Sequence, residues 1–566
     1  MNQPSLTAWY RRSILLPTLL SSLLCWLAFP PVGWGWIVWI APIGWLLPIG
    51  WQELPGHRPY RALWLAGFVF WLLTVHWIRL PHPANYLALV VLASYLGCYL
   101  PAFVALSRVG VHRLRLPLWL VAPVVWTGLD LVRAHMINGF SMGSLAHTQV
   151  DFLPVIQIAD LVGEYGVTFL IVLVAASLTQ SFFTHQVSLF RRCCPLLVAM
   201  PAFTIVTLYG FWMVTGDVHY NRSPPGPRIA LIQGNTPADW KSDPERQLSI
   251  MQEYARLSEE AVEQAQQLDG RSVDLIIWPE TVYRYPFFTV SEDFIAPPDQ
   301  FPDSTLNAAQ HDLAEFVQRT DAAILTGIDR VHLYPTDFGH THFENFNSSI
   351  FINKQGELVG TYDKMHRVIM GEYVPFAEWI PWLAMLTPIT GSVSAGQHPQ
   401  AFEVDEFIYC PNICYETTVP HLIRRQVREL AAADASPDVL VNLTNDAWFW
   451  GSSELDMHLA CGIFRAIEMR LPLVIAANGG LSAYVDPFGN VRQVTPRQET
   501  ATLLVDLPKR PAAGLTFYAR WGDWFAGVCV VCCMVLGVVG WWGLGNGYVA
   551  DGADALHHSS QSDVAS

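Results

Sequence analysis

The chain has 566 residues, of which 52% are hydrophobic and only 14% are charged, and it contains 23 tryptophans. A soluble protein usually has about 25% charged residues, so this composition argues against a wholly soluble protein. The formal net charge of −15 at pH 7 argues against nucleic-acid binding, which needs a basic surface. The length favours two or more domains.

The ten cysteines do not form the pattern of a disulfide framework. Seven of them lie in or beside apolar segments, and only Cys410, Cys414 and Cys461 fall in the more polar block of the chain. The single C-x-x-C run, Cys529 to Cys532, lies inside an apolar segment and has no second pair, and there is no H-E-x-x-H motif. We therefore expect no metal site.

Apolar stretches of roughly 20 residues predict membrane-spanning helices, and they flank a more polar block of the chain. A cleavable signal peptide is the competing interpretation of the first stretch, but it has no small-x-small cleavage site and further stretches follow at once. The predicted spans are 13–29, 32–50, 62–78, 86–107, 117–132, 165–185, 196–214 and 524–545.

The arginines of the short loops predict the orientation of these spans. If the N-terminus is cytoplasmic, nine arginines lie on the inner side and only Arg79 and Arg133 on the outer side. After seven crossings the polar block then lies on the outer side of the membrane. The predicted divisions are a membrane domain at 1–215, a catalytic domain at 216–513, the eighth span with its lead-in at 514–545, and a disordered cytoplasmic tail at 546–566.

Within the polar block, short β-branched runs alternate with amphipathic helices, which predicts an α/β domain with buried sheets. Strands are expected at 228–235, 274–280, 322–327, 348–353, 407–416, 438–446, 471–478 and 481–487. Helices are expected at 244–268, 305–319, 418–433 and 454–470.

Three reactive residues stand where predicted strands end, which is where α/β domains place catalytic groups. Glu280 ends the predicted strand 274–280 in the motif WPE, and Lys364 follows the strand LVGTYD. Cys414 lies in PNICYE, where a predicted strand meets a turn. A single Glu after a strand is usually a surface residue, and a single buried Cys is usually a core residue, so none of the three alone indicates an active site. Together, a carboxylate base, a cation for an oxyanion and a thiol nucleophile suffice for acyl transfer through a thioester.

Four ordered motifs carry a specific resemblance: WPE at 278–280, YDKMHRVIMGEYVPF at 362–376, NICYE at 412–416 and NLTNDAWF at 442–449. They resemble the motifs of the nitrilase superfamily, which has a Glu–Lys–Cys triad on an α-β-β-α sandwich. Such a domain between a seventh and an eighth span, together with GEYGVTFL at 163–170, resembles the apolipoprotein N-acyltransferases.

This resemblance implies that Glu280 is the general base, Lys364 the oxyanion stabiliser and Cys414 the nucleophile. Glu372, Tyr415 and Glu416 match supporting positions, although Tyr415 and Glu416 could equally be a packed aromatic and a turn carboxylate. The implied reaction is a ping-pong transfer of an acyl chain from a phospholipid to the α-amino group of a lipoprotein's diacylglyceryl-cysteine, and it requires no cofactor. The resemblance also implies a bacterial inner membrane, with the catalytic domain in the periplasm.

Two positions depart from the family pattern. Trp240 precedes Lys241, whereas the family commonly has a Trp just after this Lys, so a substrate role for Trp240 is in doubt. GFSMG at 139–143 replaces a Pro-Trp, a change expected to alter packing and not chemistry.

The segment 374–393 is rich in large apolar side chains and lies between the Lys and Cys motifs. We expect a lid in the membrane interface, with Trp379, Trp382 and Leu386 binding lipid; the alternative is a loop packed on the domain or the spans. A membrane-anchored amidase that passes the acyl group to water would need neither seven leading spans nor an apolar lid. A transporter would need more ionisable residues within its spans.

Overall fold

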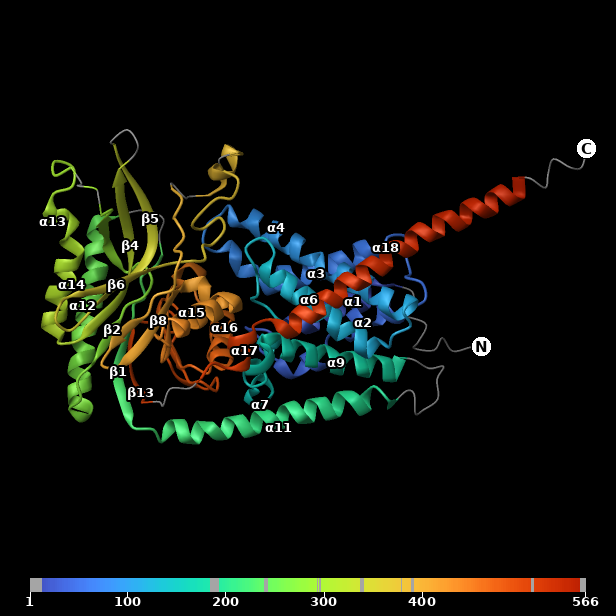
Figure 1. Cartoon of the computed structure of the whole chain (residues 1–566), viewed down its shortest axis with the longest axis horizontal. Coiled ribbons are helices and arrows are strands. Elements are labelled where there is room, and N and C mark those ends of the chain that lie inside the picture. The colour runs from blue at the N-terminus through green and yellow to red at the C-terminus, as the bar shows by residue number, and fades with distance from the viewer. Residues whose placement is uncertain are drawn as a thin grey trace, which may run out of the picture.

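A bundle of apolar helices stands beside an α/β unit built on two sheets in the computed structural model of the chain (Figure 1). The structure describes residues 13–183, 193–238, 243–292, 294, 297–335, 340–377, 379–387, 391–509 and 514–559. Trp240 and Lys241 lie outside these residues, so the doubt about Trp240 stays open.

Each of the eight predicted spans falls on an apolar helix of the bundle. The main helices are α1 (Leu15–Leu27), α2 (Ile43–Gly50), α3 (Pro59–Thr74), α4 (Asn85–Gly97), α5 (Tyr99–Arg108), α6 (Leu118–His135), α9 (Glu164–Phe183), α11 (Leu196–Asn221) and α18 (Trp524–Ser559). Short helical turns connect them: η3 (Gly35–Trp39), η4 (His76–Arg79), η5 (Val109–Arg113), η6 (Leu145–Gln149), α7 (Leu153–Ile156), α8 (Ala159–Val162) and α17 (Phe517–Trp521).

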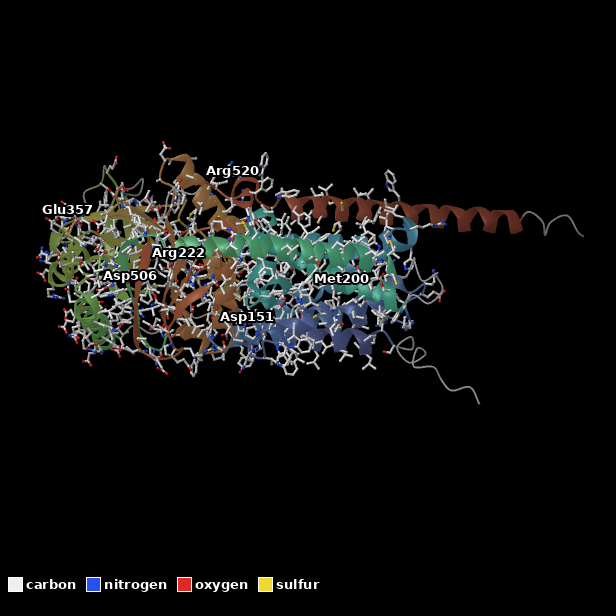
Figure 2. The ribbon with its side chains drawn as sticks, turned by 90° about the horizontal axis from the view of Figure 1, so that it is seen from below. Asp151, Met200, Arg222, Glu357, Asp506 and Arg520 are labelled. Atoms are coloured by element: carbon white, nitrogen blue, oxygen red, sulfur yellow. The ribbon has the colours of Figure 1, made fainter. Side chains whose placement is uncertain are left out.

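Four helical stretches of the described chain are long and apolar enough to cross a membrane: Asn85–Arg113, Glu164–Phe182, Leu196–Gly216 and Trp524–Trp542. The apolar helices Leu15–Leu27 and Gly35–Gly50 are shorter. Figure 2 shows mostly carbon along the bundle, around Met200, and dense oxygen and nitrogen over the α/β unit, near Glu357 and Asp506. The predicted multi-pass helical part is therefore confirmed, whereas the number of crossings stays a prediction.

Two predicted boundaries differ from the observed helices. The membrane domain was expected to end at residue 215, but α11 continues to Asn221. A disordered tail was expected from Asn546, but α18 continues as a helix to Ser559 and extends beyond the rest of the bundle (Figure 1). Extending an existing helix needs no new nucleus, so an apolar helix can continue into a sequence that has no apolar periodicity of its own.

The α/β unit contains two sheets in the described part of the chain. The seven-stranded sheet has the order β13-β1-β2-β4-β5-β6, with β3 also paired to β4; the six-stranded sheet has the order β12-β11-β10-β9-β8-β7. The strands of the first sheet are β1 (Pro225–Gln233), β2 (Leu275–Ile277), β3 (Tyr283–Val290), β4 (Ala323–Pro335), β5 (Thr341–Ile352), β6 (Leu358–Asp363) and β13 (Ala501–Pro508). Those of the second are β7 (Phe402–Val404), β8 (Phe407–Ile413), β9 (Val439–Asn445), β10 (Leu473–Asn478), β11 (Ala483–Val485) and β12 (Val491–Val494).

Helices cover the outer face of each sheet, which gives the predicted α-β-β-α order. One core lies between the sheets and includes Leu231, Ile277 and Val441. A second core joins the first sheet to α12 (Pro244–Asp269) and α14 (Ala308–Thr320), which follows the short α13 (Asp303–Leu306). The second sheet is covered by α15 (Pro420–Ala432) and α16 (Glu454–Met469).

Local sequence explains why these elements begin and end where they do. The Asp243 side chain caps α12 by accepting from the Glu245 N–H at 3.2 Å, and Gly270, with φ +77°, ends the helix. Strand β10 is buried along its whole length because helices cover one face and the first sheet the other. Each strand and helix predicted for this block falls on an observed element, whereas β3, β7, β12 and β13 were not predicted.

The helix layer of α15 and α16 lies between the second sheet and the bundle (Figure 1). Buried ion pairs cross this boundary. The Arg465 guanidinium on α16 lies 2.9 Å from Glu164 of α9 and 2.9 Å from Glu468, and Arg470 lies 2.9 Å from Asp160 of α8. The α/β unit is therefore packed directly on the bundle through charged and apolar contacts.

Candidate active site

Cys414 occupies a sharp turn between a buried strand and a helical turn. Strand β8 ends at Ile413, and the 3-10 helix η8 (Cys414–Thr418) begins at the cysteine itself. Its φ of +52° lies in the left-handed region, which residues with a side chain rarely adopt. The side chain is half-buried. A strained position of this kind is typical of functional residues.

The side chains of Glu280 and Lys364 are buried and in direct contact. The Lys364 ammonium lies 3.1 Å from Oε1 of Glu280 and 2.9 Å from Oε1 of Glu372. Asn347, on β5, donates from Nδ2 to the same two oxygens, at 2.8 Å each. The Asn445 N–H donates to Oε2 of Glu280 at 3.1 Å. The two carboxylates are thus held around one lysine.

Burial and these charges shift the pKa values of Cys414 and Lys364. Burial raises the pKa of the Cys414 thiol well above its usual value, and the charge of Glu280 raises it further, while Lys364 opposes both. Burial alone would lower the pKa of Lys364, but Glu280 and Glu372 raise it well above its ordinary value. The resting site therefore holds a neutral thiol beside a permanently charged ammonium group.

Glu416 ties the loop of the lysine to the loop of the cysteine. Its carboxyl accepts from the N–H groups of Met365 at 2.7 Å, His366 at 2.9 Å and Ile413 at 2.7 Å, and from the Tyr362 hydroxyl at 2.8 Å. Burial raises the pKa of Glu416 to about 7, and these donors limit the rise. A turn carboxylate with four donors from two loops fixes the relative position of both loops.

Tyr415 joins the site to the helical bundle. Its hydroxyl donates to the Gly139 carbonyl at 2.9 Å, and the Ser141 hydroxyl donates to the Thr418 carbonyl. The segment 139–143, where GFSMG departs from the family pattern, therefore contacts the helical turn that begins at Cys414. These contacts are hydrogen bonds, and the effect of the departure on packing and chemistry stays a prediction.

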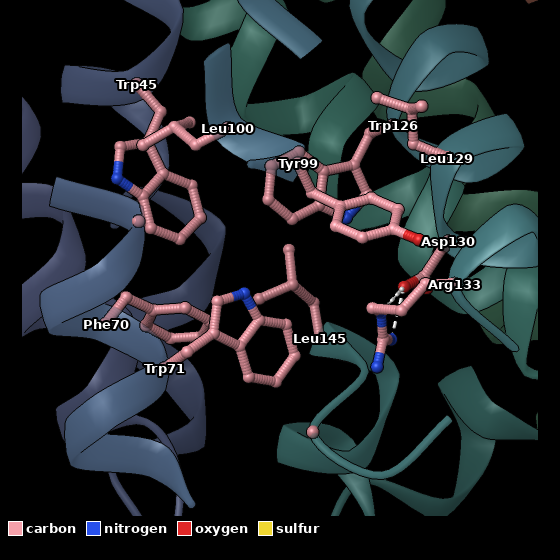
Figure 3. Close-up of a pocket in the computed structure, with 12 residues that line it drawn as sticks. Trp45, Phe70, Trp71, Tyr99, Leu100, Trp126, Leu129, Asp130, Arg133 and Leu145 are labelled. Atoms are coloured by element: carbon pink, nitrogen blue, oxygen red, sulfur yellow. Dashed lines mark hydrogen bonds and ion pairs between the residues drawn. The ribbon is translucent and has the colours of Figure 1, made fainter. Parts of the chain in front are cut away.

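A narrow, mostly apolar pocket lies inside the bundle on the other side of this segment, which contributes Gly143. Figure 3 shows aromatic rings gathered around it and Arg133 turned to Asp130 at one end. Arg133 also donates to the Phe140 and Met142 carbonyls. The ring-bearing residues of the pocket are Trp45, Phe70, Trp71, Tyr99 and Trp126.

The same two-part organisation is found in known proteins. A family profile described as the apolipoprotein N-acyltransferase N-terminal domain matches residues 21–177, and one described as carbon-nitrogen hydrolase matches residues 228–512. An apolipoprotein N-acyltransferase from Geobacter metallireducens is 31% identical over 552 residues, covering 95% of this chain and 96% of that relative. The chain belongs to the apolipoprotein N-acyltransferase family.

Another apolipoprotein N-acyltransferase, from Rhodopirellula baltica, is 29% identical over 543 residues and covers 89% of this chain and 93% of its own length. Among solved structures, an amidase from Nesterenkonia sp. aligns with 50% of this chain and 91% of its own, at 18% identity and a TM-score of 0.34. Like its relatives, the chain is an acyltransferase with a membrane part and a nitrilase-like sandwich, as its fold and motifs predicted.

The structure brings several of the site residues predicted from the sequence together, and their catalytic roles stay predictions. Glu280, Lys364 and Glu372 share direct contacts, and Glu416 links the lysine loop to Cys414. Asn347 was missed, because no motif surrounds it and only the pairing of β5 with β6 brings it to the carboxylates. Thr444 and Asp446 lie in the quoted NLTNDAWF motif but were not assigned to the site.

One group of three buried side chains in the described chain has the composition of a metal site: Asp446, Glu454 and His458. The His458 Nε2 faces the Cys414 carbonyl at 3.2 Å, and Nδ1 faces Asp446 at 3.4 Å. Since both neighbours are acceptors, both ring nitrogens carry hydrogen. Such an imidazolium has no lone pair to offer a metal, so this group does not suit one.

The expected lid is an irregular segment that contains a short 3-10 helix, η7 (Pro381–Leu386). Trp379 and Trp382 are 81% and 60% exposed, which is unusual for tryptophan and leaves them available for contact. The side chain of Leu386 is outside what the structure describes. Whether the segment is a lid stays a proposal.

Proposed function

We propose that the protein moves an acyl chain from a phospholipid to the α-amino group of a lipoprotein's N-terminal diacylglyceryl-cysteine, with Cys414 as the covalent carrier. The observation that carries this proposal is the position of Cys414. The charges of Glu280 and Lys364 both act on the pKa of its thiol. The helical turn that begins at Cys414 is hydrogen-bonded to the membrane bundle. Both lipid-anchored substrates would therefore meet the nucleophile next to the bilayer.

In the first step, Glu280 accepts the proton of the Cys414 thiol while the sulfur attacks the carbonyl carbon of a phospholipid ester. Two N–H donors of Lys364 are directed at Glu280 and Glu372, which leaves the third without a partner in the described chain for the developing oxyanion. The ester C–O bond then breaks, and the lysophospholipid oxygen takes the proton from Glu280. A thioester on Cys414 remains.

In the second step, the α-amino group of the acceptor attacks the thioester carbonyl and gives a proton to Glu280. The C–S bond breaks, the product is an amide, and the proton returns to the Cys414 sulfur. Glu372 stays ionised throughout because, although burial alone would raise its pKa, Lys364 and its hydrogen-bond donors hold it below the usual value. Its role is to hold Lys364 in place.

The membrane pocket and the exposed tryptophans support a lipid substrate. The aromatic pocket shares the segment 139–143 with the nucleophile's turn, so apolar side chains of the bundle lie next to the segment that contacts this turn. The nine-to-two bias of arginines supports a catalytic unit on the periplasmic face of the inner membrane.

Intact mass spectrometry tests the proposal directly. Purified protein incubated with phospholipid alone should gain the mass of one acyl chain, and Cys414→Ala should gain none. Cys410→Ala should acylate like the parent, because Cys410 is fully buried in β8, where burial and the charge of Glu416 raise the pKa of its thiol to about 12.

Adding a diacylglyceryl-cysteine peptide should then discharge the adduct into an N-acyl peptide. Loss of the adduct to water at the same rate without peptide would instead favour an amidase that hydrolyses its acyl-enzyme. An acyl adduct on the Cys414→Ala variant would contradict the assignment of the nucleophile.

A further inference from the structure

The backbone of Cys414 is held by two side chains that belong to neither the Glu280–Lys364 group nor the loops of that group. Its carbonyl oxygen accepts from Nδ2 of Asn442 at 3.1 Å and from Nε2 of His458 at 3.2 Å. Both donors come from the α/β unit, Asn442 from β9 and His458 from α16. Because Cys414 has a φ of +52°, its conformation needs such external support to persist.

The thiol end of the same residue is tied to the same helix through a chain of contacts. Thr444 is hydrogen-bonded to the Cys414 side chain, and its hydroxyl donates to Oδ1 of Asp446 at 2.6 Å. That carboxylate lies 3.4 Å from Nδ1 of His458. The contacts therefore close a ring that runs from the thiol through Thr444, Asp446 and His458 back to the cysteine carbonyl.

Chemistry limits where the hydrogens of this ring can lie. Thr444 has one hydroxyl hydrogen, which it donates to Asp446 at rest. Its contact with Cys414 lowers the pKa of the thiol, which is the effect of a hydrogen donated to the sulfur. His458 must carry hydrogen on both ring nitrogens to face a carboxylate and a carbonyl. The charged groups around it favour this form: burial alone would lower the pKa of His458, but Asp446 and Glu454 raise it to about 9, with Cys461 also facing the ring.

We infer that His458 is a positioning residue, which acts through Asp446, Thr444 and the Cys414 carbonyl to keep the thiol aimed at the acyl carbon. This inference rests on the proposed role of Cys414 as the nucleophile. His458, Asp446 and Thr444 form no covalent bond with the substrate. Asn442 alone cannot replace them, because it holds the carbonyl but has no contact with Thr444 or Asp446 among the described interactions.

Two substitutions at one position separate positioning from simple stability. His458→Gln keeps an N–H donor near the place of Nε2, whereas His458→Phe fills similar space without a donor. The matched control is Ser258→Ala, which removes a buried hydroxyl that accepts from the Trp278 indole at 2.9 Å in the core beyond the first sheet. All three variants are compared with the parent in detergent, at equal folded fraction.

The measurement is the rate of acyl-adduct formation on Cys414 over a range of phospholipid concentrations. His458→Phe should lower the maximal rate on the order of a hundredfold, because a misplaced nucleophile loses its near-attack geometry. The lipid concentration for half-maximal rate should stay the same. His458→Gln should recover most of the rate, and Ser258→Ala should behave like the parent.

Other outcomes would overturn the inference. Parent-like acylation by His458→Phe, or an equal loss in His458→Phe and His458→Gln, would show that donation from this position does not matter. Loss of parent activity on dialysis against a chelator would indicate a metal at Asp446, Glu454 and His458 instead. Alkylation of Cys414 by iodoacetamide is recorded in parallel. If neither the parent nor any variant forms a lipid adduct, but His458→Phe still slows alkylation, then the proposed lipid reaction is wrong and the positioning role of His458 stands.

Discussion

At the scale of the residue, the unusual feature of this site is the raised pKa of the thiol that we propose as the nucleophile. Burial and the nearby Glu280 carboxylate raise the pKa of the Cys414 thiol well above its usual value, and Lys364 offsets only part of this. Thiolates are formed in many enzymes before substrate arrives. Here the proton is better removed when the ester is in place, which protects the thiol from unproductive reactions.

This arrangement predicts how Cys414 reacts with iodoacetamide as pH changes. Alkylation requires the thiolate, so its rate should keep rising as pH increases through 9 and should not level off near neutrality. Glu280→Gln removes a negative charge that disfavours the thiolate, so the alkylation profile should move to lower pH while lipid acylation is lost. Alkylation rates followed by mass spectrometry check both statements, and a shift to higher pH in Glu280→Gln would contradict them.

Sequence motifs indicate reactive side chains more readily than the side chains that position them. Glu280, Lys364 and Cys414 stand at strand ends, and reactive side chains at strand ends of an α/β sheet can be recognised from the chain alone. His458 could not be recognised in this way. It lies in the middle of an amphipathic helix, where a histidine is usually a packed core residue, and its partners Asp446 and Cys414 come from separate segments.

At the scale of the element, the segment between the lysine and cysteine motifs differs from the rest of the catalytic unit. Most large apolar side chains of this unit are buried in three cores, whereas Trp379, Trp382 and Met385 are all more than half exposed. Tryptophan is preferred at the boundary between lipid headgroups and acyl chains. The segment is therefore suited to contact a bilayer or a lipid entering the site.

The lid proposal predicts a defect in lipid capture without a defect in chemistry. In Trp379→Ser/Trp382→Ser, each lost side chain removes roughly 1.5–3 kcal/mol of apolar burial, so the lipid concentration for half-maximal acylation should rise on the order of tenfold or more. Alkylation of Cys414 by a small water-soluble reagent should be unchanged, because neither tryptophan is an acid or a base. Acylation at the parent rate at every lipid concentration would mean that the segment only packs.

At the scale of the whole molecule, the boundary between the bundle and the sandwich is a buried polar surface and not a loose tether. Arg465 lies between two carboxylates, Glu164 from the bundle and Glu468 from its own helix, and His147 contacts Glu164 at 3.0 Å. Burial raises the pKa of Glu468 to about 8, although Arg465 opposes the rise. Such a cluster is stable only when all its members are present.

Removing the central cation should therefore destabilise the whole enzyme. Arg465→Met removes the cation shared by two buried carboxyl groups and leaves Glu164 only its contact with His147, a change that costs about 3–5 kcal/mol. The thermal midpoint of the detergent-solubilised protein should fall clearly. The control is Arg425→Met, whose exposed pair with Glu429 contributes about 0–1 kcal/mol. Equal midpoints for the two variants would show that the cluster adds nothing to stability.

The arginine bias makes a separate prediction about topology. A reporter that is active only outside the cytoplasm should work when fused near Pro224, between α11 and the sandwich. Fused after Asn546, beyond the predicted eighth span, it should be silent. Reporter activity at both positions would mean that the number of crossings differs from eight.

The division of the chain into a membrane part and an α/β part was predictable because hydropathy and strand patterns differ so strongly between them. Their contact surface was not. Glu164 and Arg465 are separated by most of the chain, and each would be an ordinary helix residue when considered alone. The exposed residues of β12 and the short β7 gave no alternation that would identify them as strands.

The pairing of β1 with β13 has a consequence for the way the protein is made. These strands join the first and last segments of the sandwich, from Pro225 opposite Pro508 to Gln233 opposite Ala501. During synthesis β1 emerges first, and its outer neighbour emerges only when almost the entire sandwich has left the ribosome. Until then one edge of β1 is open to pairing with other chains. Completion of the first sheet, and with it protection from aggregation, therefore waits for the last strand before α17 and α18 return the chain to the bundle.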